Sequence, residues 1–218
     1  MSFTFDQETH TGMMDGVFWP SVTQILGELK LVDYSMVPEE ILENKRILGT
    51  RVHYATALID NCELDEADTA ERFPEILPYL EAYRKFRIIE KFEPSEQKIG
   101  RLYSPKWLFH GELDEAGDRI EKRGAENYII DYKTTFKLFP STGPQTAAYS
   151  LLLCERLKIR VKKRFGLLLK SNGNYELHPL NDPSDLLDFH AALRIWWQRV
   201  KKYQTLDPKK LLKGGSPC

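Results

Sequence analysis

Tyr128-Ile129-Ile130-Asp131-Tyr132-Lys133-Thr134 is an apolar run that ends in an acid and a lysine two positions apart. Side chains at positions i and i+2 of a strand point to the same face, so Asp131 and Lys133 are expected to project together beyond the buried isoleucines. Upstream, Gly111-Glu112-Leu113-Asp114 is a second strand-like segment that ends in an acid. The residues between the two acids are enough for a turn and a returning strand, which predicts that Asp114 lies beside Asp131.

Two carboxylates and a lysine at the ends of neighbouring strands are typical of a site for a divalent metal ion and a water beside a phosphodiester. Magnesium prefers carboxylate oxygens and keeps several waters, one of which can attack phosphorus. Lys133 would orient that water or offset the developing charge. Taken alone, however, Asp131 and Lys133 are better explained as an ordinary surface ion pair.

The composition is that of one globular domain. With 218 residues, of which 42% are hydrophobic and 29% charged, the chain has no apolar run that approaches the roughly 20 residues of a membrane-spanning helix. The first residues lack a basic segment followed by an apolar core, which predicts a cytoplasmic protein. The three cysteines are widely spaced and form no CxxC pair, so we expect reduced thiols and neither a zinc site nor an iron–sulfur cluster.

The net charge of -1 hides an uneven distribution. Acids dominate residues 60–75, a basic cluster occupies residues 156–164, and further lysines lie within residues 201–213. Each cluster taken alone is explained equally well as a solvated face or as a binding surface. A position close to a site would favour phosphate binding by the basic cluster.

The first part of the chain is expected to be helical. Ser21 and Gln24 have the spacing of a capping box, which predicts a first helix from Ser21. A second helical region begins at Pro38, is interrupted at Gly49-Thr50 and is followed by an acidic loop. The apolar periodicity of residues 78–89 predicts a third helix.

The pattern then changes to short strands. Residues 96–103, 107–114 and 127–133 are expected to form an antiparallel meander. A helix is predicted over residues 142–157, and the dipeptide at 172–173, Asn-Gly, predicts a hairpin between strands 164–170 and 174–178. Asp182 and Pro183 are typical of the start of a last helix, whose apolar stripe faces the core.

This order of elements predicts an α/β fold in which a central mixed sheet is flanked by helices on both sides. One domain is expected to span residues 1–218. Within it, residues 1–92 would form an N-terminal arm and helices, residues 93–180 the sheet core with the site, and residues 181–218 a C-terminal helix and a basic tail.

Four further residues are candidates for the site. Glu96, at the start of the preceding strand, would contribute a carboxylate one strand further out. His53 has apolar neighbours and is better explained, taken alone, as a core histidine than as a ligand. Gln145 and Tyr149 lie one helical turn apart just after the site strand, where an amide and a phenol can reach phosphate, although helix packing explains this pair equally well.

The chain also contains an ordered set of short motifs: Pro20-Ser21-Val22-Thr23, Gly49-Thr50-Arg51-Val52-His53, Glu96, Gly111-Glu112-Leu113-Asp114, Ile130-Asp131-Tyr132-Lys133-Thr134 and Gln145-Thr146-Ala147-Ala148-Tyr149. Taken together and in this order, the set resembles the PD-(D/E)XK nuclease superfamily, and within it the RecB-like and phage-type exonucleases. The resemblance covers about residues 19–149. It implies a restriction-endonuclease-like core for the predicted α/β fold.

The resemblance assigns the metal-binding side of the site. It implies that Asp114 and Asp131 are the metal-binding acids and that the backbone carbonyl of Tyr132 is a further ligand. His53 matches a helix histidine that approaches the metal in this branch. Glu96 is an additional candidate ligand.

The remaining site residues follow from the same resemblance. Lys133 is the lysine of the motif, and Gln145 and Tyr149 match the motif that supports the site and its DNA contacts. Asp131 stands where many members carry Glu, which the family pattern permits. Nucleases of this group that carry an iron–sulfur cluster need four cysteines, so three cysteines exclude that subgroup.

The activity implied by the resemblance is a Mg²⁺-dependent DNA exonuclease, in which Mn²⁺ can substitute, acting on DNA ends in recombination, repair or phage DNA processing. Arg51, Lys162, Lys163 and Arg164 would contact DNA, so binding should weaken steeply with salt. A recombination or single-strand-annealing protein is the expected partner, in the cytoplasm of a bacterium or a phage-infected cell, with no membrane association.

Two alternatives stay open. An endonuclease of the same superfamily, restriction-like or structure-specific, would use the same site, because nothing in the sequence reports a dependence on DNA ends. A non-catalytic nucleic-acid-binding subunit would retain the fold, although the intact Asp114, Asp131 and Lys133 disfavour it.

Overall fold

The strand that ends in Asp131 and Lys133 lies at the centre of a five-stranded sheet. The computed structural model describes residues 2–6, 9, 11–29, 37–95, 99–121 and 124–203. The strand order is β10–β9–β8–β7–β4, and the strands are β4 (Phe92–Pro94), β7 (Glu115–Glu121), β8 (Gly124–Lys133), β9 (Lys163–Leu169) and β10 (Tyr175–Pro179). β8 pairs in parallel with β9, whereas the other neighbouring pairs are antiparallel. The sheet is therefore mixed, as predicted.

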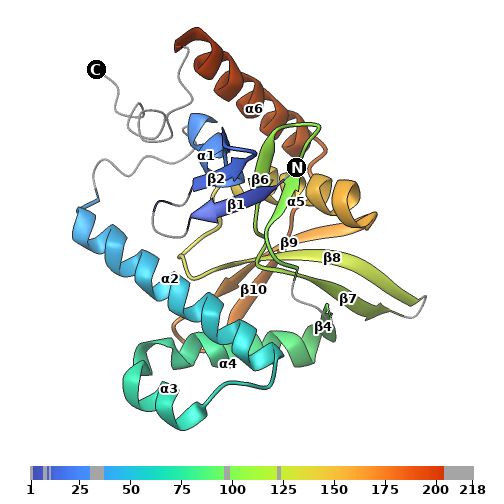
Figure 1. Ribbon diagram of the computed structural model, residues 1–218. Helices are drawn as coiled ribbons and strands as arrows, with labels where there is room; N and C mark the ends of the chain where they lie inside the picture. The colour runs from blue at the N-terminus through green and yellow to red at the C-terminus, as the bar shows by residue number, and fades with distance from the viewer. Residues whose placement is uncertain are drawn as a thin grey trace.

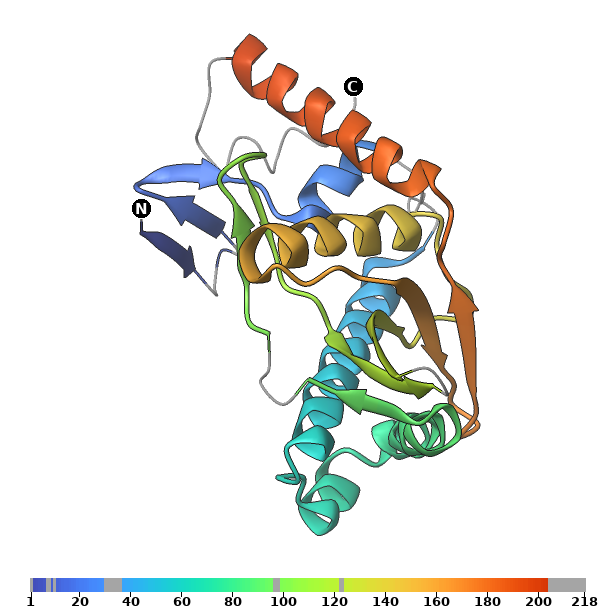
Figure 2. The same ribbon diagram turned by 90° about the vertical axis from the view of Figure 1, so that its right-hand side faces the viewer.

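Helices cover both faces of this sheet (Figure 1). They are α1 (Val22–Leu26), α2 (Glu39–Asp60), α3 (Glu66–Arg72), α4 (Leu77–Glu90), α5 (Thr142–Leu157) and α6 (Ser184–Tyr203), with 3₁₀ turns at Gly27–Leu29 and Pro74–Ile76. In Figure 2, α5 and α6 lie on one side of the sheet and α2 and α4 lie on the other. The predicted α/β architecture is confirmed at this level.

Alternation along β8 divides the apolar residues into two cores. Ile129 packs into a core that contains Leu152 of α5 and Phe189 of α6. Ile130, the next residue, points to the opposite face and packs into a core that contains Leu80 of α4. Complete burial of such side chains contributes about 1.5–3 kcal/mol each, so both faces of the sheet are needed to hold β8 in place.

The helix α5 forms the connection from β8 to β9. Parallel neighbours cannot be joined by a tight turn, and α5 provides the crossover between them. The helix has the bounds predicted from the sequence.

β9 and β10 form the predicted hairpin at Asn172-Gly173, in which Gly173 takes a φ of 75° that favours glycine.

Two smaller sheets lie beside the main one. The first contains β1 (Phe3–Asp6), β2 (Thr11–Met14) and β3 (Val17–Trp19), and the second contains β5 (Leu102–Ser104) and β6 (Phe109–Gly111). The N-terminal residues were expected to be a short arm. The Asp15-Gly16 dipeptide, with φ values of 47° and 81°, makes the turn between β2 and β3, and an Asp-Gly pair is a hairpin signal that sequence reasoning overlooked.

The predicted antiparallel meander is wrong in its middle strand. The strand expected over 107–114 ends at Gly111, and it pairs with β5 in the separate small sheet. The strand next to β8 is instead β7, which begins at Glu115, one residue after Asp114. Of the first predicted strand, residues 96–98 lie outside the described residues.

Two helical predictions also need correction. α2 continues through Gly49-Thr50, where an interruption was expected, because its packing outweighs the cost of about 1 kcal/mol for glycine inside a helix. The acidic stretch after α2 was expected to be a loop, but it contains α3. Asp65 caps this helix by accepting the backbone N–H groups of Ala67 and Asp68.

The other predicted helix starts are confirmed. Ser21 and Gln24 form the capping box of α1, in which each side chain accepts the other residue's backbone N–H. The Asp182 side chain accepts the backbone N–H of Ser184 at the start of α6. Among the described helices, none combines the length and the apolar character needed to cross a membrane.

The packing of α5 gives a test of the two-core arrangement. Leu152→Ala should lower the free energy of unfolding by about 2–5 kcal/mol, because Leu152 is fully buried between the sheet and α6. Leu157→Ala, five residues along the same helix, is the matched control, since Leu157 is 44% exposed and should cost much less. Urea unfolding measures both variants, and equal losses would contradict the packing described.

Candidate active site

The register between β7 and β8 brings the two predicted acids together. The strands are antiparallel, and Glu115 at the start of β7 pairs with Ile130 near the end of β8. Asp114 directly precedes β7 and therefore lies beside Asp131. The sequence predicted this neighbourhood from the end of one strand, whereas the structure produces it from the start of another.

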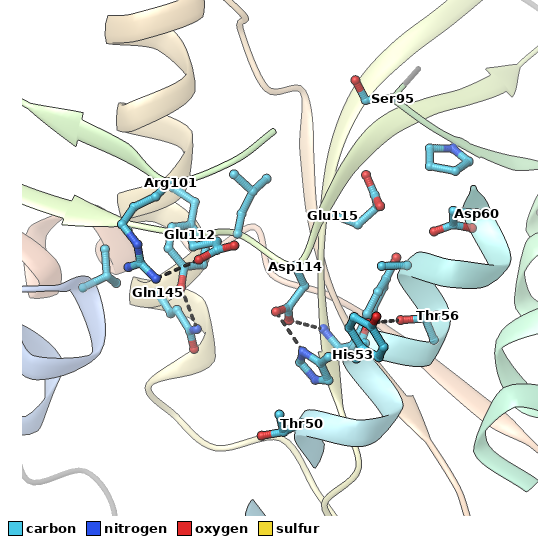
Figure 3. A pocket seen from close by; sticks show the side chains of 18 of the residues that line it. Thr50, His53, Thr56, Asp60, Ser95, Arg101, Glu112, Asp114, Glu115 and Gln145 are labelled. Atoms are coloured by element: carbon cyan, nitrogen blue, oxygen red, sulfur yellow. Dashed lines mark hydrogen bonds and ion pairs between the residues drawn. The ribbon is translucent and has the colours of Figure 1, made fainter. Parts of the chain in front are cut away.

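Asp114 is held by contacts from two elements. Its Oδ2 accepts the backbone N–H of Tyr132 at 2.8 Å, and its Oδ1 lies 3.0 Å from Nδ1 of His53 on α2. The two side chains point toward each other in Figure 3. The His53 ring also packs edge-on against the Tyr132 ring, with the centroids 5.9 Å apart. The sheet and α2 thus fix the orientation of this carboxylate jointly.

The electrostatics of the His53–Asp114 contact favour an ion pair. Burial opposes the charged form of His53, but the Asp114 carboxylate outweighs this effect and raises the pKa of His53. Burial likewise opposes ionisation of Asp114, and His53 outweighs it, so the pKa of Asp114 is lowered. A charged imidazole beside an ionised carboxylate follows from these opposite shifts.

Asp131 and Lys133 form a tighter and more buried pair. Nζ of Lys133 lies 2.5 Å from Oδ2 of Asp131, and Asp131 is only 1% exposed. No donor among the described residues hydrogen-bonds to Oδ1 of Asp131. Burial raises the pKa of Asp131 to about 6, although the Lys133 ammonium counteracts the shift. The surface ion pair that was the simpler explanation for these residues does not describe a carboxylate so deeply buried.

A pocket of about 1000 Å³ opens in front of these groups. His53, Asp114, Lys133, Gln145 and Tyr149 all contribute to its lining, whereas Asp131 lies behind Lys133. Tyr132, whose backbone carbonyl is a predicted ligand, lines the pocket as well, so six of the residues predicted for the site surround it. Asp131 is paired with one of them.

α5 forms the wall opposite α2. Nε2 of Gln145 donates to the Tyr149 hydroxyl at 3.1 Å. Burial raises the pKa of Tyr149 and keeps its phenol neutral. A Cβ at Gly111 would lie 2.8 Å from the Tyr149 ring and 2.9 Å from Val22, so a side chain at position 111 would displace the phenol. Glycine at the end of β6 therefore makes room for Tyr149.

Sequence reasoning missed several charged residues of this pocket. Arg101 and Glu112 form an ion pair at 2.7 Å on the Gln145 side of Asp114, and Asp60 and Glu115 lie on the other side (Figure 3). Burial, followed by the charge of Asp60, raises the pKa of Glu115 to about 8. Glu112 and Glu115 lie two residues before and one residue after Asp114, and this proximity in the sequence could have identified them as pocket residues.

No local sequence pattern identifies Arg101 as a pocket residue, because tertiary contacts determine its position. Its Nη1 lies 3.2 Å from Nδ1 of His110, and its guanidinium stacks on Phe5 at 3.5 Å from the ring centroid. Burial lowers the pKa of His110 to about 3, so the imidazole is neutral and accepts from Arg101. The unexpected N-terminal sheet, through Phe5, thus joins Glu112 and His110 in holding Arg101 at the pocket.

The residues predicted to bind DNA do not gather at the pocket. Lys162 and Lys163 lie at the start of β9, where Lys163 pairs with Tyr128. That point is roughly 10 Å along β8 from Asp131, in the middle of β8 and at the end of β9 away from the pocket. The basic cluster, which follows α5 in sequence, therefore sits at the opposite end of the crossover. DNA contact by Lys162 and Lys163 stays a prediction.

Arg164 and Arg51 have other partners in the structure. Arg164 donates to the Gly143 carbonyl and pairs with Asp185, each at 2.8 Å, and its side chain is 13% exposed. It ties the start of α5 to α6, and DNA contact by Arg164 stays a prediction. Arg51 pairs with Glu75 at 2.7 Å and lies over Phe73.

The predicted metal ligands that the structure describes are two carboxylates, a carbonyl and the His53 imidazole, whose Nδ1 lies against Asp114. Within the described ranges, no group of three or more His, Cys, Asp or Glu side chains has the arrangement of a metal centre. Asp114, Asp131 and the Tyr132 backbone carbonyl nevertheless lie at one strand end. Glu96, the other candidate ligand, is outside the described residues.

Comparison with known proteins adds no constraint. Neither a protein-family model nor a curated protein matches this chain.

The His53–Asp114 pair predicts a pH effect with a definite sign. Because the pKa of His53 is raised, the stability from its charge is present below about pH 6.5 and is lost as pH rises through the folded-state pKa. Asp114→Asn should lower the His53 pKa to below 6.5, because burial and the Lys133 charge would then be opposed only by the smaller effect of Asp131. NMR titration of the His53 ring in chelator measures this, and an unchanged pKa would show that the contact is absent in solution.

Proposed function

We propose that this chain is a Mg²⁺-dependent deoxyribonuclease of the PD-(D/E)XK type, which removes nucleotides from DNA ends. The observation that carries the proposal is the convergence of His53, Asp114, Lys133, Gln145 and Tyr149 on one pocket, with Asp131 paired to Lys133. These residues come from α2, β8, α5 and the residue before β7, so their meeting is not a consequence of sequence proximity. The order of the motifs along the chain adds support.

The oxygen donors of the pocket fit magnesium. Lys133 pairs with Oδ2 of Asp131, whereas the buried Oδ1 receives no hydrogen bond from the described residues and is the oxygen left to a metal ion. Magnesium needs only one or two protein carboxylates and retains several waters, so Asp114, Asp131 and the Tyr132 carbonyl are enough. Manganese accepts the same oxygen ligands. A bound divalent cation would neutralise charge that develops on the phosphate and lower the pKa of a water.

The same carboxylates explain why a cation would be required. Asp114 and Glu112 line the pocket beside Lys133 and Arg101, so carboxylates face an incoming phosphate. Without added positive charge, the carboxylates would repel DNA. We therefore expect DNA to bind in the pocket only weakly when the divalent cation is removed.

Each side chain has a distinct task in this proposal. Lys133, held beside Asp131, orients the attacking water and offsets the charge that builds on the phosphate. His53 holds the Asp114 carboxylate in place through Nδ1. Tyr149 accepts the Gln145 N–H, so its own hydroxyl can donate to a phosphate oxygen.

The activity test uses DNA labelled at the 5′ or the 3′ end, together with covalently closed circular DNA, in Mg²⁺ and in EDTA. Linear DNA should be degraded from its ends in Mg²⁺, and circular DNA should persist. Cleavage of the circles would identify an endonuclease with the same site. Metal-dependent cleavage of neither substrate would contradict the proposal.

Variants assign the activity to the pocket. Lys133→Ala and Asp131→Asn should each reduce the rate about 100-fold or more, because each removes a charge needed in the transition state. Lys170→Ala is the matched control, since Lys170 pairs with Glu176 on the β9–β10 hairpin, away from the pocket lining. Circular dichroism verifies folding. Full activity of a folded Lys133→Ala protein would show that the site is wrongly assigned.

A further inference from the structure

The segment between β8 and α5 begins and ends at the pocket. Lys133 precedes it and Gln145 follows it on the first turn of α5, and both residues line the pocket. Phe136, three residues after Lys133, is 96% exposed, which is the highest value among the large hydrophobic side chains of the described residues. Lys137 beside it is exposed as well.

Contacts on both sides hold the tip of this segment in place. The Thr135 hydroxyl donates to the Lys137 carbonyl at 2.8 Å and closes a turn around Phe136. Leu138 packs so closely on β9 that a Cβ at Gly166 would lie 2.5 Å from it. On the other side, Thr134 lies 3.6 Å from the Cβ position of Gly49 on α2. Phe136 is therefore displayed at a fixed place and is not simply part of an unanchored loop.

The distance from Lys133 limits what this ring can reach. Three extended residues span at most about 11 Å, so Phe136 lies within about that distance of Lys133 along the chain. A single exposed aromatic side chain is ordinary on a protein surface. An aromatic ring beside an exposed lysine, within about 11 Å of a pocket proposed to hold phosphate, is however the combination with which proteins bind single-stranded nucleic acid.

We propose that Phe136 and Lys137 form a single-strand contact at the mouth of the pocket. Phe136 stacks on an unpaired base close to the phosphate held beside Lys133, and Lys137 pairs with a neighbouring phosphate. A base inside a duplex has both faces covered, so this contact selects single-stranded DNA or a frayed end over paired DNA. The inference rests on the proposed nuclease function and names its substrate class.

The test measures binding without cleavage. Fluorescence anisotropy with a labelled oligothymidine strand and with a blunt duplex is recorded in Ca²⁺, which takes the same oxygen ligands, and gels verify that the DNA stays intact. Phe136→Ala should weaken binding of the single strand about 5- to 100-fold, the loss of one stacked base, and should change duplex binding little. Phe136→Trp keeps an aromatic face and should stay within about 3-fold of the native protein.

Three controls isolate the stacking contact. Ile88→Ala on α4 removes another exposed apolar side chain, 77% exposed, and should leave binding unchanged. Thermal unfolding of Phe136→Ala should match that of the native protein, because the ring is almost fully exposed. An oligonucleotide with abasic sites should bind the native protein and Phe136→Ala equally. Lys137→Ala should reduce the salt dependence of binding by about 0.7 in the log–log slope.

The outcomes separate this proposal from the nuclease proposal. Unchanged single-strand binding by Phe136→Ala, an equal loss for duplex, or no binding of DNA at all would overturn the single-strand contact. Hydrolysis that requires Lys133 but ignores Phe136 would leave the nuclease proposal standing alone. Phe136-dependent binding by a protein that cleaves no DNA would instead retain the contact and reject the nuclease.

Discussion

The backbone N–H of Tyr132 donates to the Asp114 carboxylate, and the rest of the pocket depends on this bond. It links the residue before β7 to the end of β8 at the point where the two strands meet. The same carboxylate then positions His53, while Tyr132 sends its own ring into the core beneath α4. Because side chains alternate along β8, the residues on either side of Tyr132, Asp131 and Lys133, must point to the opposite face.

The two faces of β8 therefore lie in different chemical environments. One face buries Tyr128, Ile130 and Tyr132 against α2 and α4. The other buries Ile129 against α5 and then continues into Asp131 and Lys133, where the apolar packing gives way to charge. A carboxylate at 1% exposure is tolerated there because Lys133 lies against it. The stability of two apolar cores thus supports a charged group that would be unfavourable on its own.

Local patterns revealed much of the fold, and long-range contacts set the rest. The bounds of α5, the Asn172-Gly173 hairpin and the Ser21 cap depend on neighbouring residues, so they could be predicted from the sequence. The continuity of α2 through Gly49 and the start of β7 directly after Asp114 depend on tertiary packing, which local propensity does not report. The position of Arg101 at the pocket could not be predicted from the sequence, because its guanidinium stacks on Phe5, almost a hundred positions earlier. The placement of Asp131 and Lys133 on one face was predictable because strand alternation is a local rule.

The His53–Asp114 contact joins residues 61 positions apart in the chain, and α5 must cross over before β9 can pair with β8. Contacts this distant carry a large loop-closure entropy, so they form together with the fold and not ahead of it. A chain still emerging from the ribosome, with β8 made but β9 missing, has its acids and lysine in sequence but no sheet to fix them. Assembly of the pocket is thereby tied to completion of the whole domain.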